Sequence, residues 1–453
     1  MDLISSIPVI GPFLLAAIPF IICLSIVVAI HELGHLMVGR WCGIKAEVFS
    51  VGFGRVLYSR RDRHGTVWQL ALLPLGGFVK FVGDMDPSSS RRASDEDVAP
   101  EDRPHAFHNA ALWRRTLTVL AGPVANFLLS IIIFFTIALL TPKGSDEPVI
   151  GTIDPEIVGL SDFREGDRVL SVNGTETPDF PSVFSEMIRT NGELSTAQVL
   201  RDGAEMDVEF RYLTRPRVTN VSSDGAAIAA GIVPGDMILA VNDVEIASSR
   251  HLILLGVDLE VGKDITVRVD RDGDIREFTF APRFVERPHP ETGEIIPLPT
   301  MGVQLGELNI LPLEESRSFG EAAISSVDSV VRIITDSLNY IEQMLFKGAT
   351  TDHLSGPIGI AKHSANAASG GWLTFVHFIA FISTAIGLMN LFPIPVLDGG
   401  HLMFYAAEAV RGRPANEHIV RYGTVAGLSL LLLLMVFVTF NNDLGLGAWL
   451  AQN

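Results

Sequence analysis

The sequence predicts an α-helical membrane protein with four transmembrane helices, a membrane-associated β-hairpin and two small inserted α+β domains. Hydrophobic residues make up 48% of the 453 residues and charged residues only 19%, a more apolar balance than in most soluble enzymes. Four stretches without Asp, Glu, Lys or Arg are long enough to cross a bilayer, which takes about 20 residues. A long polar insert with an internal repeat separates the second stretch from the third.

The uncharged stretches are Val9–Ile30, Thr116–Thr141, Trp372–Leu397 and Tyr422–Phe440. The spans are expected at about residues 9–39, 116–141, 372–400 and 422–440. The alternative is a set of buried helices in a large soluble core. Four such runs, one reading "LSLLLLLMVFVTF", favour the membrane.

Lys and Arg predict the orientation of the spans. The segment 40–115 holds 12 of them, and the loop before the fourth span holds Arg411, Arg413 and Arg421. Because cytoplasmic loops carry the basic excess, both loops are expected in the cytoplasm, and both termini and the insert outside. No Lys or Arg precedes Arg40, so the charged n-region of a cleaved signal peptide is not expected.

Overall charge and cysteine content exclude two classes of protein. The net charge of −18 argues against a nucleic-acid partner, because binding to phosphates needs a basic patch. Two cysteines, Cys23 and Cys42, do not indicate a disulfide framework.

The insert contains a repeat with an offset of about 70 residues. "REGDRVLSVNGTE" (164–176) aligns with "VPGDMILAVNDVE" (233–245), and "VLRDGAEMDVEF" (199–210) aligns with "VDRDGDIREFTF" (269–280). In each unit a Gly-Asp turn leads into an alternating strand and a tight Asn-containing turn. Two tandem domains are expected at 145–215 and 216–285.

A Pro-rich linker and an amphipathic helix are expected within 286–371, before the C-terminal half of the membrane domain at 372–453. Apolar residues recur every three or four positions in "SFGEAAISSVDSVVRIITDSLNYIEQMLFKG". This helix is expected against the membrane surface or under the inserted domains, and packing inside the insert is the alternative.

His31-Glu32-Leu33-Gly34-His35 has the pattern H-E-x-x-H at the end of the first span. On a helix, residues i and i+4 share a face, so both imidazoles can reach one ion. Zinc suits imidazole nitrogen, and Glu32 is placed to act on a water rather than on the metal. The alternative is a pair of polar core histidines.

A third ligand is predicted in "MNLFPIPVLDGGH" (389–401), which places Asp398 at the cytoplasmic end of the third span. The first span ends on the same side, so the two polar sites fall at one depth. Pro393 and Pro395 interrupt the helix, which is tolerated where a cavity is lined. Gly399 and Gly400 permit close approach of the backbone.

Together, H-E-x-x-H, N-x-x-P-x-P-x-L-D-G-G and the tandem insert resemble the site-2 protease family, in particular its bacterial subgroup that regulates the sigma-E response. The insert units resemble PDZ domains, the second most closely in "SSDGAAIAAGIVPGD" (222–236). The likeness extends to "GFGRVL" (52–57), "LLPLGGFVKFVGD" (72–84), "AGPVANF" (121–127) and "SGPIGIAKHSA" (355–365).

The resemblance implies a zinc endopeptidase with His31, His35 and Asp398 as zinc ligands and Glu32 as general base. The substrate-binding residues that it implies are Asn390, Pro393, Pro395, Gly76 and Gly77. For Asn126 a helix-packing role is an open alternative, His401 is a candidate supporting residue of the metal site, and His377 is expected only to pack or to meet the interface.

The implied setting is the bacterial inner membrane, with the PDZ domains and both termini periplasmic and the active site toward the cytoplasm. The implied substrates are single-span membrane proteins: an anti-sigma factor already shortened by a first protease, and remnant signal peptides. Peptide termini or periplasmic ligands at the PDZ domains and membrane lipid complete the expected partners.

"TVWQLALLPLGGFVKF" (66–81) is predicted to form a hairpin at about 66–82 that dips into the membrane. Its free edge would add the unwound substrate as another strand. A small soluble hairpin on the cytoplasmic surface is the alternative. The sequence does not say which strand is the edge.

Two other functions compete with the peptidase. One is a membrane scaffold whose PDZ domains bind partners beside a non-catalytic metal site, and the other is a metal transporter. The presence of every expected catalytic residue argues against the scaffold. A transporter would need neither PDZ domains nor a base beside the metal.

Overall fold

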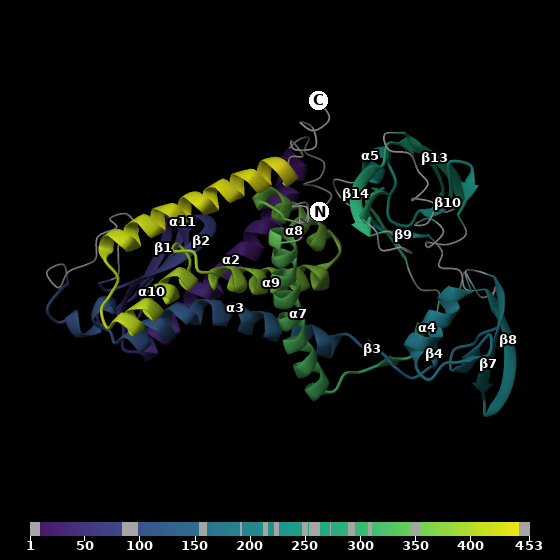
Figure 1. Ribbon diagram of the computed structural model, residues 1–453, viewed down its shortest axis with the longest axis horizontal. Helices are drawn as coiled ribbons and strands as arrows, with labels where there is room; N and C mark the ends of the chain where they lie inside the picture. Colours follow the sequence, from purple (N-terminus) through teal and green to yellow (C-terminus); the bar gives the residue numbers. More distant parts are fainter. Residues whose placement is uncertain are drawn as a thin grey trace. The chain divides into compact units, whose positions relative to one another are not determined.

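The computed structural model describes residues 10–83, 98–153, 161–190, 193–211, 216–221, 226–246, 252, 263–271, 273–288, 295–306, 310–346 and 354–443. Part of the PDZ-like motif, 222–225, lies outside them. The chain divides into two compact units (Figure 1). The first joins the residues up to Leu140 with those from Ser318 onward, and the second is Thr141–Arg317.

Among the described residues of the first unit, four helices are long enough and apolar enough to cross a membrane, as predicted. They are α2 (Ile10–Trp41), α3 (Leu112–Leu140), α9 (Trp372–Asn390) and α11 (Glu417–Val438). The buried share of the apolar window is largest in α9, at 33%, and smallest in α11, at 11%. Therefore α9 lies centrally and α11 lies at the outside of the unit (Figure 1).

Helices α2 and α3 cross closely at Gly34. A Cβ atom at Gly34 would lie 2.4 Å from the carbonyl oxygen of Ala121 and 2.7 Å from the Cβ of Ala125. Small residues allow membrane helices to approach in this way. The crossing places α3 beside the histidines of α2.

The third span is shorter than predicted, because α9 ends at Asn390 and a separate helix, α10 (Asp398–Arg411), begins at Asp398. The expectation of a span to residue 400 is therefore wrong. Two prolines lie in the connection, and proline cannot continue a helix. Gly399 and Gly400 are buried against this connection, and a Cβ at either would lie 2.3 Å from a carbonyl oxygen.

A bidentate ion pair fixes α10 to α3. Arg115 donates to both carboxylate oxygens of Glu408, at 2.7 and 3.3 Å, and its guanidinium lies 5.1 Å from the ring centroid of Tyr405. The two charged side chains are 9% and 16% exposed, so water screens the pair little.

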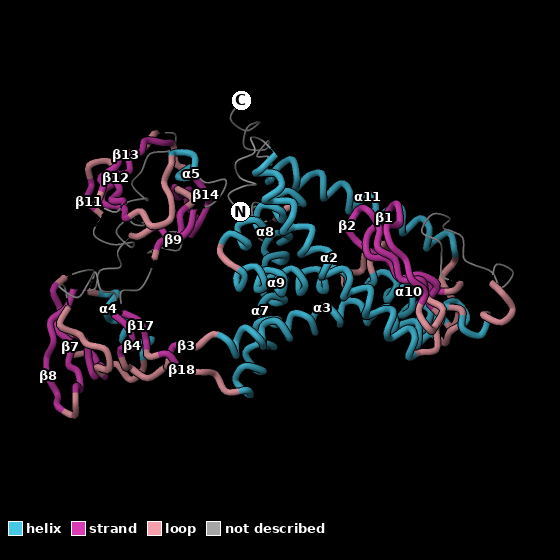
Figure 2. The backbone as a smooth tube through the Cα atoms, turned by 180° about the vertical axis from the view of Figure 1, so that it is seen from behind, coloured by secondary structure: helices cyan, strands magenta, loops and turns pink. Residues whose placement is uncertain are grey.

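The β-hairpin is larger than predicted and has a different turn. Its strands are β1 (Ala46–Arg61) and β2 (Val67–Phe81), joined by a tight turn at 62–66. Residues 66–81 therefore do not pair with themselves, and the expected hairpin at 66–82 is wrong. The chain does reverse between residues 70 and 77, but residues 48–51 lie between the two arms of this reversal. Figure 2 shows the two strands beside the helices of the first unit.

Both strands bend, so the hairpin folds back on itself. Residues 48–51 pair with 77–80 and also with 67–70, while 58–61 pair with 67–70. Segment 67–70 thus lies between two partners. Segment 77–81 pairs with β1 on one side, and its other side is an edge in the ladder of described residues.

Polar contacts tie the turn of the hairpin to the end of α2. Arg40 pairs with Asp62 and donates to the Thr66 hydroxyl at 2.8 Å. Asp62 also accepts from the Trp68 indole at 2.9 Å. Burial raises the pKa of Asp62, but its hydrogen bonds outweigh this effect and lower that pKa to about 2.

The second unit contains two four-stranded sheets with equivalent strand orders. The first is β6 (Thr175–Glu176), β5 (Arg168–Val172), β7 (Leu194–Arg201) and β8 (Ala204–Arg211), with α4 (Phe180–Arg189). The second is β11 (Val244–Glu245), β10 (Met237–Val241), β12 (Ile265–Arg271) and β13 (Asp274–Phe280), with α5 (Ala226–Ala230).

Equivalent positions in the two sections make the same contacts. Arg201 donates two hydrogen bonds to Asp167, and Arg271 donates two to Asp236. Each of these aspartates is almost fully buried. The same ion pair thus anchors the Gly-Asp turn to the third strand of both sheets.

The segment expected as a Pro-rich linker consists largely of strands. These are β14 (Arg283–Pro288), β15 (Ile295–Thr300), β16 (Val303–Leu305), β17 (Ile310–Pro312) and β18 (Glu314–Glu315). β16 pairs with β9 (Val218–Val221), β17 with β4 (Ile150–Ile153) and β18 with β3 (Lys143–Gly144). The first inserted section is therefore completed by residues beyond 215.

The predicted amphipathic helix is α7 (Phe319–Phe346), and it belongs to the first unit rather than to the insert. Val330 packs with Phe134 of α3 and Ala380 of α9. Packing inside the insert is therefore wrong. The other helical elements of the described residues are α8 (Pro357–Ser369), η1 (Arg103–His105), η2 (Phe107–Asn109) and η4 (Thr439–Asp443).

Candidate metal centre

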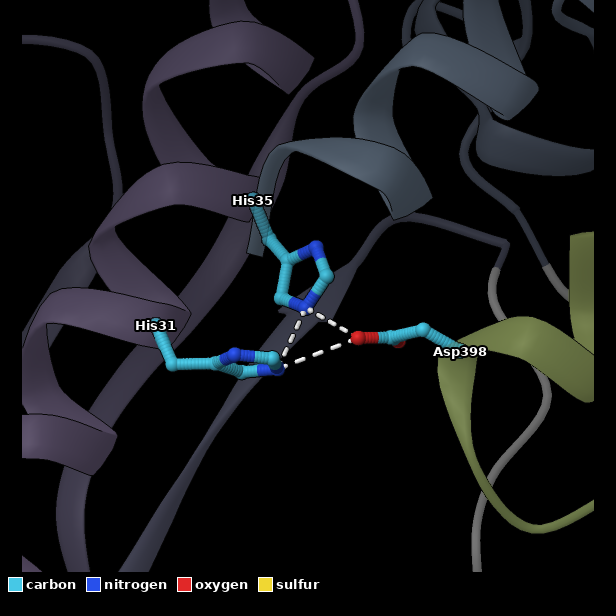
Figure 3. Close-up of side chains that lie close together, drawn as sticks. All are labelled: His31, His35 and Asp398. Atoms are coloured by element: carbon cyan, nitrogen blue, oxygen red, sulfur yellow. Dashed lines mark hydrogen bonds and ion pairs between the residues drawn. The ribbon is translucent and has the colours of Figure 1, made fainter. Parts of the chain in front are cut away.

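Helices α2 and α10 bring His31, His35 and Asp398 together (Figure 3). The two imidazole Nε2 atoms lie 3.2 Å apart, and they lie 3.1 and 3.5 Å from Oδ2 of Asp398. The histidines are one turn apart on α2, and Asp398 is the first residue of α10. The proline-containing connection before α10 therefore places the carboxylate of Asp398 next to the two histidines.

The spacing of these three atoms fits a tetrahedral zinc site. Zinc lies about 2.0–2.2 Å from imidazole nitrogen and carboxylate oxygen, so tetrahedral ligand atoms are about 3.3 Å apart. The observed separations of 3.1–3.5 Å bracket this value. Oδ2 of Asp398 is buried, and within the described part of the chain it has no hydrogen-bond partner, which a cation would supply.

The far ring nitrogens of both histidines contact α3. Nδ1 of His35 lies 2.8 Å from the carbonyl oxygen of Thr118, and Nδ1 of His31 lies 3.2 Å from the side-chain amide of Asn126. Metal-binding histidines are commonly held through this second nitrogen. The sequence gives no signal for the Thr118 contact, because any residue supplies a carbonyl.

Gly122 leaves room for the two imidazoles. A Cβ at this position would lie 2.4 Å from Nε2 of His35 and 2.8 Å from Cε1 of His31. The sequence places Gly122 in the "AGPVANF" motif but gives no signal for this role.

Glu32 lies beside the three candidate ligands and is oriented by the hairpin. The backbone N–H of Val79 donates to Oε2 of Glu32 at 3.0 Å. A Cβ at Gly77 would lie 3.5 Å from Cγ of Glu32 and 2.6 Å from the carbonyl oxygen of Ser50. The edge segment of β2 therefore passes directly along the acid.

A cavity of about 690 Å³ connects the site with its surroundings. Its lining includes the three candidate ligands and Glu32, together with Asn390, Pro395, Phe78 and Val79. It extends to Arg115 and Glu408, so polar groups continue away from the candidate metal position.

Only some of the other residues predicted for the site line this cavity. His401 lines the cavity, whereas His377 packs against the ring of Phe134 with centroids 5.1 Å apart. Pro393 is exposed and is not among the lining residues, nor are Gly76 and Gly77. A Cβ at Gly76 would lie 2.3 Å from the ring of Phe53, so this glycine serves the bend of β2.

Comparisons with known proteins show the family of this chain. The sequence profile of Peptidase family M50 matches residues 19–434. This chain belongs to Peptidase family M50. The M50 peptidase is 31% identical to the Regulator of sigma-E protease RseP of Escherichia coli K12, over 93% of this chain and 97% of that one.

Two further relatives of the M50 peptidase cover almost its whole length. The Regulator of sigma E protease of Salmonella typhi is 31% identical over 93% of this chain and 97% of its own. A protein of Mesorhizobium japonicum, named as a zinc metalloprotease, is 33% identical over 96% of this chain and 100% of its own. The prediction of a site-2-type zinc metallopeptidase is confirmed.

Proposed function

We propose that this peptidase cleaves peptide bonds in or near the transmembrane segments of single-span membrane proteins. The observation that carries the proposal is that three features lie together. The ligand atoms of His31, His35 and Asp398 converge on one position. Glu32 lies beside them, and the edge of β2 runs along Glu32. A metal site, a base and a strand-binding edge are the parts that hydrolysis of an unwound helix requires.

His31, His35 and Asp398 would hold the zinc. Bound zinc supplies a Lewis acid and lowers the pKa of water toward ~7. Glu32 takes the proton of the attacking water and passes it to the leaving amine. The hydrogen bond from Val79 holds the carboxylate of Glu32 in place for both transfers.

The substrate is held extended along the free side of segment 77–81. A peptide bond inside a helix has its backbone groups already paired, so the helix must unwind before attack. Strand addition satisfies the unwound backbone, which is costly to leave unpaired in a membrane. The bond from Val79 to Glu32 supports this assignment, because a strand added there lies next to the base. Asn390 lines the same cavity and is suited to hold the substrate.

The second unit would act as a size filter for substrates. We assign its two sections as PDZ domains in the periplasm, on the strength of the equivalent strand orders and the basic loops elsewhere in the chain. The names of the sigma-E relatives support an anti-sigma factor fragment as substrate, in the inner membrane of a bacterium. Remnant signal peptides are a second substrate of the same kind.

The test is a comparison of purified wild type and Glu32→Gln on a model single-span substrate, with zinc content measured for both. Gln has the shape of Glu but cannot accept the proton. We expect zinc to be retained and cleavage to fall about 10²–10⁴-fold, the usual contribution of a general base. Equal cleavage by both proteins would overturn the mechanism, and a zinc-loaded wild type without any cleavage would favour the scaffold.

A further inference from the structure

We propose that Asn126 is a positioning residue that holds His31 in the tautomer whose Nε2 faces the zinc. The inference rests on the proposed function, since it assigns His31 as a ligand. It replaces the simpler view that Asn126 only packs helices together.

The backbone of Asn126 is immobilised at the junction of α3 and α9. Asn126 is fully buried, and its carbonyl oxygen accepts hydrogen bonds from the hydroxyls of Ser130, at 3.0 Å, and Ser383, at 2.9 Å. Ser130 also donates to the carbonyl oxygen of Ala380 at 2.8 Å. The side chain of Asn126 is therefore presented to α2 from a fixed point.

The amide of Asn126 lies against the ring nitrogen of His31 that does not face the candidate metal position. Nδ1 of His31 is 3.2 Å from this amide, while Nε2 is 3.1 Å from Oδ2 of Asp398. A ligand nitrogen must offer its lone pair, so the proton of the neutral ring resides on Nδ1. That proton needs an acceptor, because the ring is buried.

The orientation of the amide follows from this requirement. The oxygen and nitrogen of a side-chain amide exchange places in a half-turn and are told apart by their partners. With Nδ2 toward His31, Oδ1 of Asn126 is buried and finds no hydrogen-bond partner among the residues that the structure describes. A half-turn lets Oδ1 accept from Nδ1 of His31, as the carbonyl oxygen of Thr118 accepts from Nδ1 of His35.

The experiment measures zinc affinity rather than cleavage. In the full chain carrying Glu32→Gln, the dissociation constant of zinc is determined by chelator competition for Asn126→Leu, Asn126→Asp and Ser383→Ala. Leu keeps the size of the side chain but accepts no hydrogen bond, so we expect zinc affinity to fall about 10–100-fold. Asp keeps the acceptor, and its added charge is offset by the zinc, so affinity should equal or exceed the reference.

Ser383→Ala is the matched control, because it removes a bond to the backbone of the same residue and leaves the amide in place. We expect its zinc affinity to stay within about twofold of the reference. Thermal unfolding of each full chain checks folding, and Asn126→Ala replaces the Leu variant if that chain is not recovered folded.

Two results would overturn the role of Asn126: reference-like zinc affinity in the Leu variant, or equally weak affinity in the Leu and Asp variants. The second result would mean that Asn126 serves packing alone. A different result would count against the proposed function instead: an enzyme with wild-type Glu32 and Asn126 that binds zinc but does not cleave the substrate.

Discussion

Val79 and Glu32 are joined by a backbone-to-carboxylate hydrogen bond of 3.0 Å between the edge of the hairpin and the helix that carries His31 and His35. The bond holds the candidate base in register with the strand that would receive the substrate. Movement of this strand would therefore displace the base as well.

The first prediction concerns this edge. Val79→Pro removes the N–H that reaches Glu32, while Val79→Ala keeps it. A hydrogen bond to a charged group contributes about 1.5–3 kcal/mol, so Val79→Pro should lower cleavage at least about tenfold with zinc retained. Val79→Ala should remain close to wild type, and full activity of Val79→Pro would exclude the edge model.

A proline in segment 67–70 should behave differently. Leu70 pairs with both Val51 and Tyr58, so Leu70→Pro breaks an internal ladder. The hairpin itself should then be destabilised, seen as faster limited proteolysis and a lower unfolding temperature. Equal rates of proteolysis for Leu70→Pro and Val79→Pro would contradict the assignment of 67–70 as an internal segment and 77–81 as an edge.

A third prediction tests the space around the imidazoles. The Cβ of Gly122→Ala would lie 2.4 Å from Nε2 of His35, closer than non-bonded atoms approach. We expect more than about tenfold weaker zinc binding, by analogy with loss of a contact that orients a ligand. Gly320→Ala is the control, because a Cβ there meets no atom within 4 Å. Unchanged zinc binding in Gly122→Ala would contradict the packing described for this helix crossing.

Loss of zinc should distinguish the candidate ligands from the candidate base Glu32. A chelator should abolish cleavage by wild type, and added zinc should restore it. His31→Ala, His35→Ala and Asp398→Ala should each weaken zinc binding by more than about 100-fold, beyond the effect of losing a supporting contact. A stable zinc content in Asp398→Ala would require a different third ligand.

Acid should weaken the anchor between the hairpin and α2. The pKa of Asp62 is about 2 in the folded chain and about 3.9 when unfolded. The folded state thus gains stability from the ionised group above about pH 4, and this gain is lost as the pH falls toward 2. The difference in unfolding temperature between wild type and Asp62→Asn should be constant at neutral pH and shrink in acid. A difference that does not change with pH would contradict this account.

The size-filter hypothesis needs a deletion that respects the strand pairing. Removal of 145–285 would leave β17 and β18 but delete β4, the partner of β17. Replacing 145–313 by an Asn-Gly turn keeps the β3–β18 pair and suits a tight hairpin. We expect this chain to cleave substrates with bulky outer domains as readily as shortened ones. Retained discrimination would place the filter in the first unit.

The grouping of His31, His35 and Asp398 was predictable because the signal for each residue is local. His31 and His35 need only helical spacing to share a face, and Asp398 follows prolines that end a helix. Thr118, Gly122 and the N–H of Val79 carry no such signal. Their contributions depend on a helix crossing and a strand bend, which bring together residues far apart in the chain.

The hairpin and the linker were mispredicted for related reasons. Residues 66–81 contain two apolar runs around Pro74, and the chain does reverse between them, but the strand that pairs with both runs lies upstream in β1. Residues 283–315 contain prolines that argue against central strands, and the structure uses them in short two-stranded pairs. Helix α7 showed its helical apolar pattern in the sequence, but Ile324 and Val331 are exposed, and it is Val330 that packs against α3 and α9. Which positions of the helix are covered is a tertiary property.

The separation of the candidate ligands along the chain has a consequence for biosynthesis. A ribosome completes α2, with both histidines, long before it reaches Asp398, because the whole second unit lies between them. The nascent chain therefore carries a base and two imidazoles but no complete zinc site. Activity should appear only when the C-terminal helices have entered the membrane, so the order of synthesis itself delays proteolysis until the enzyme is assembled. A chain truncated at Asn390 should bind zinc far more weakly than the full chain.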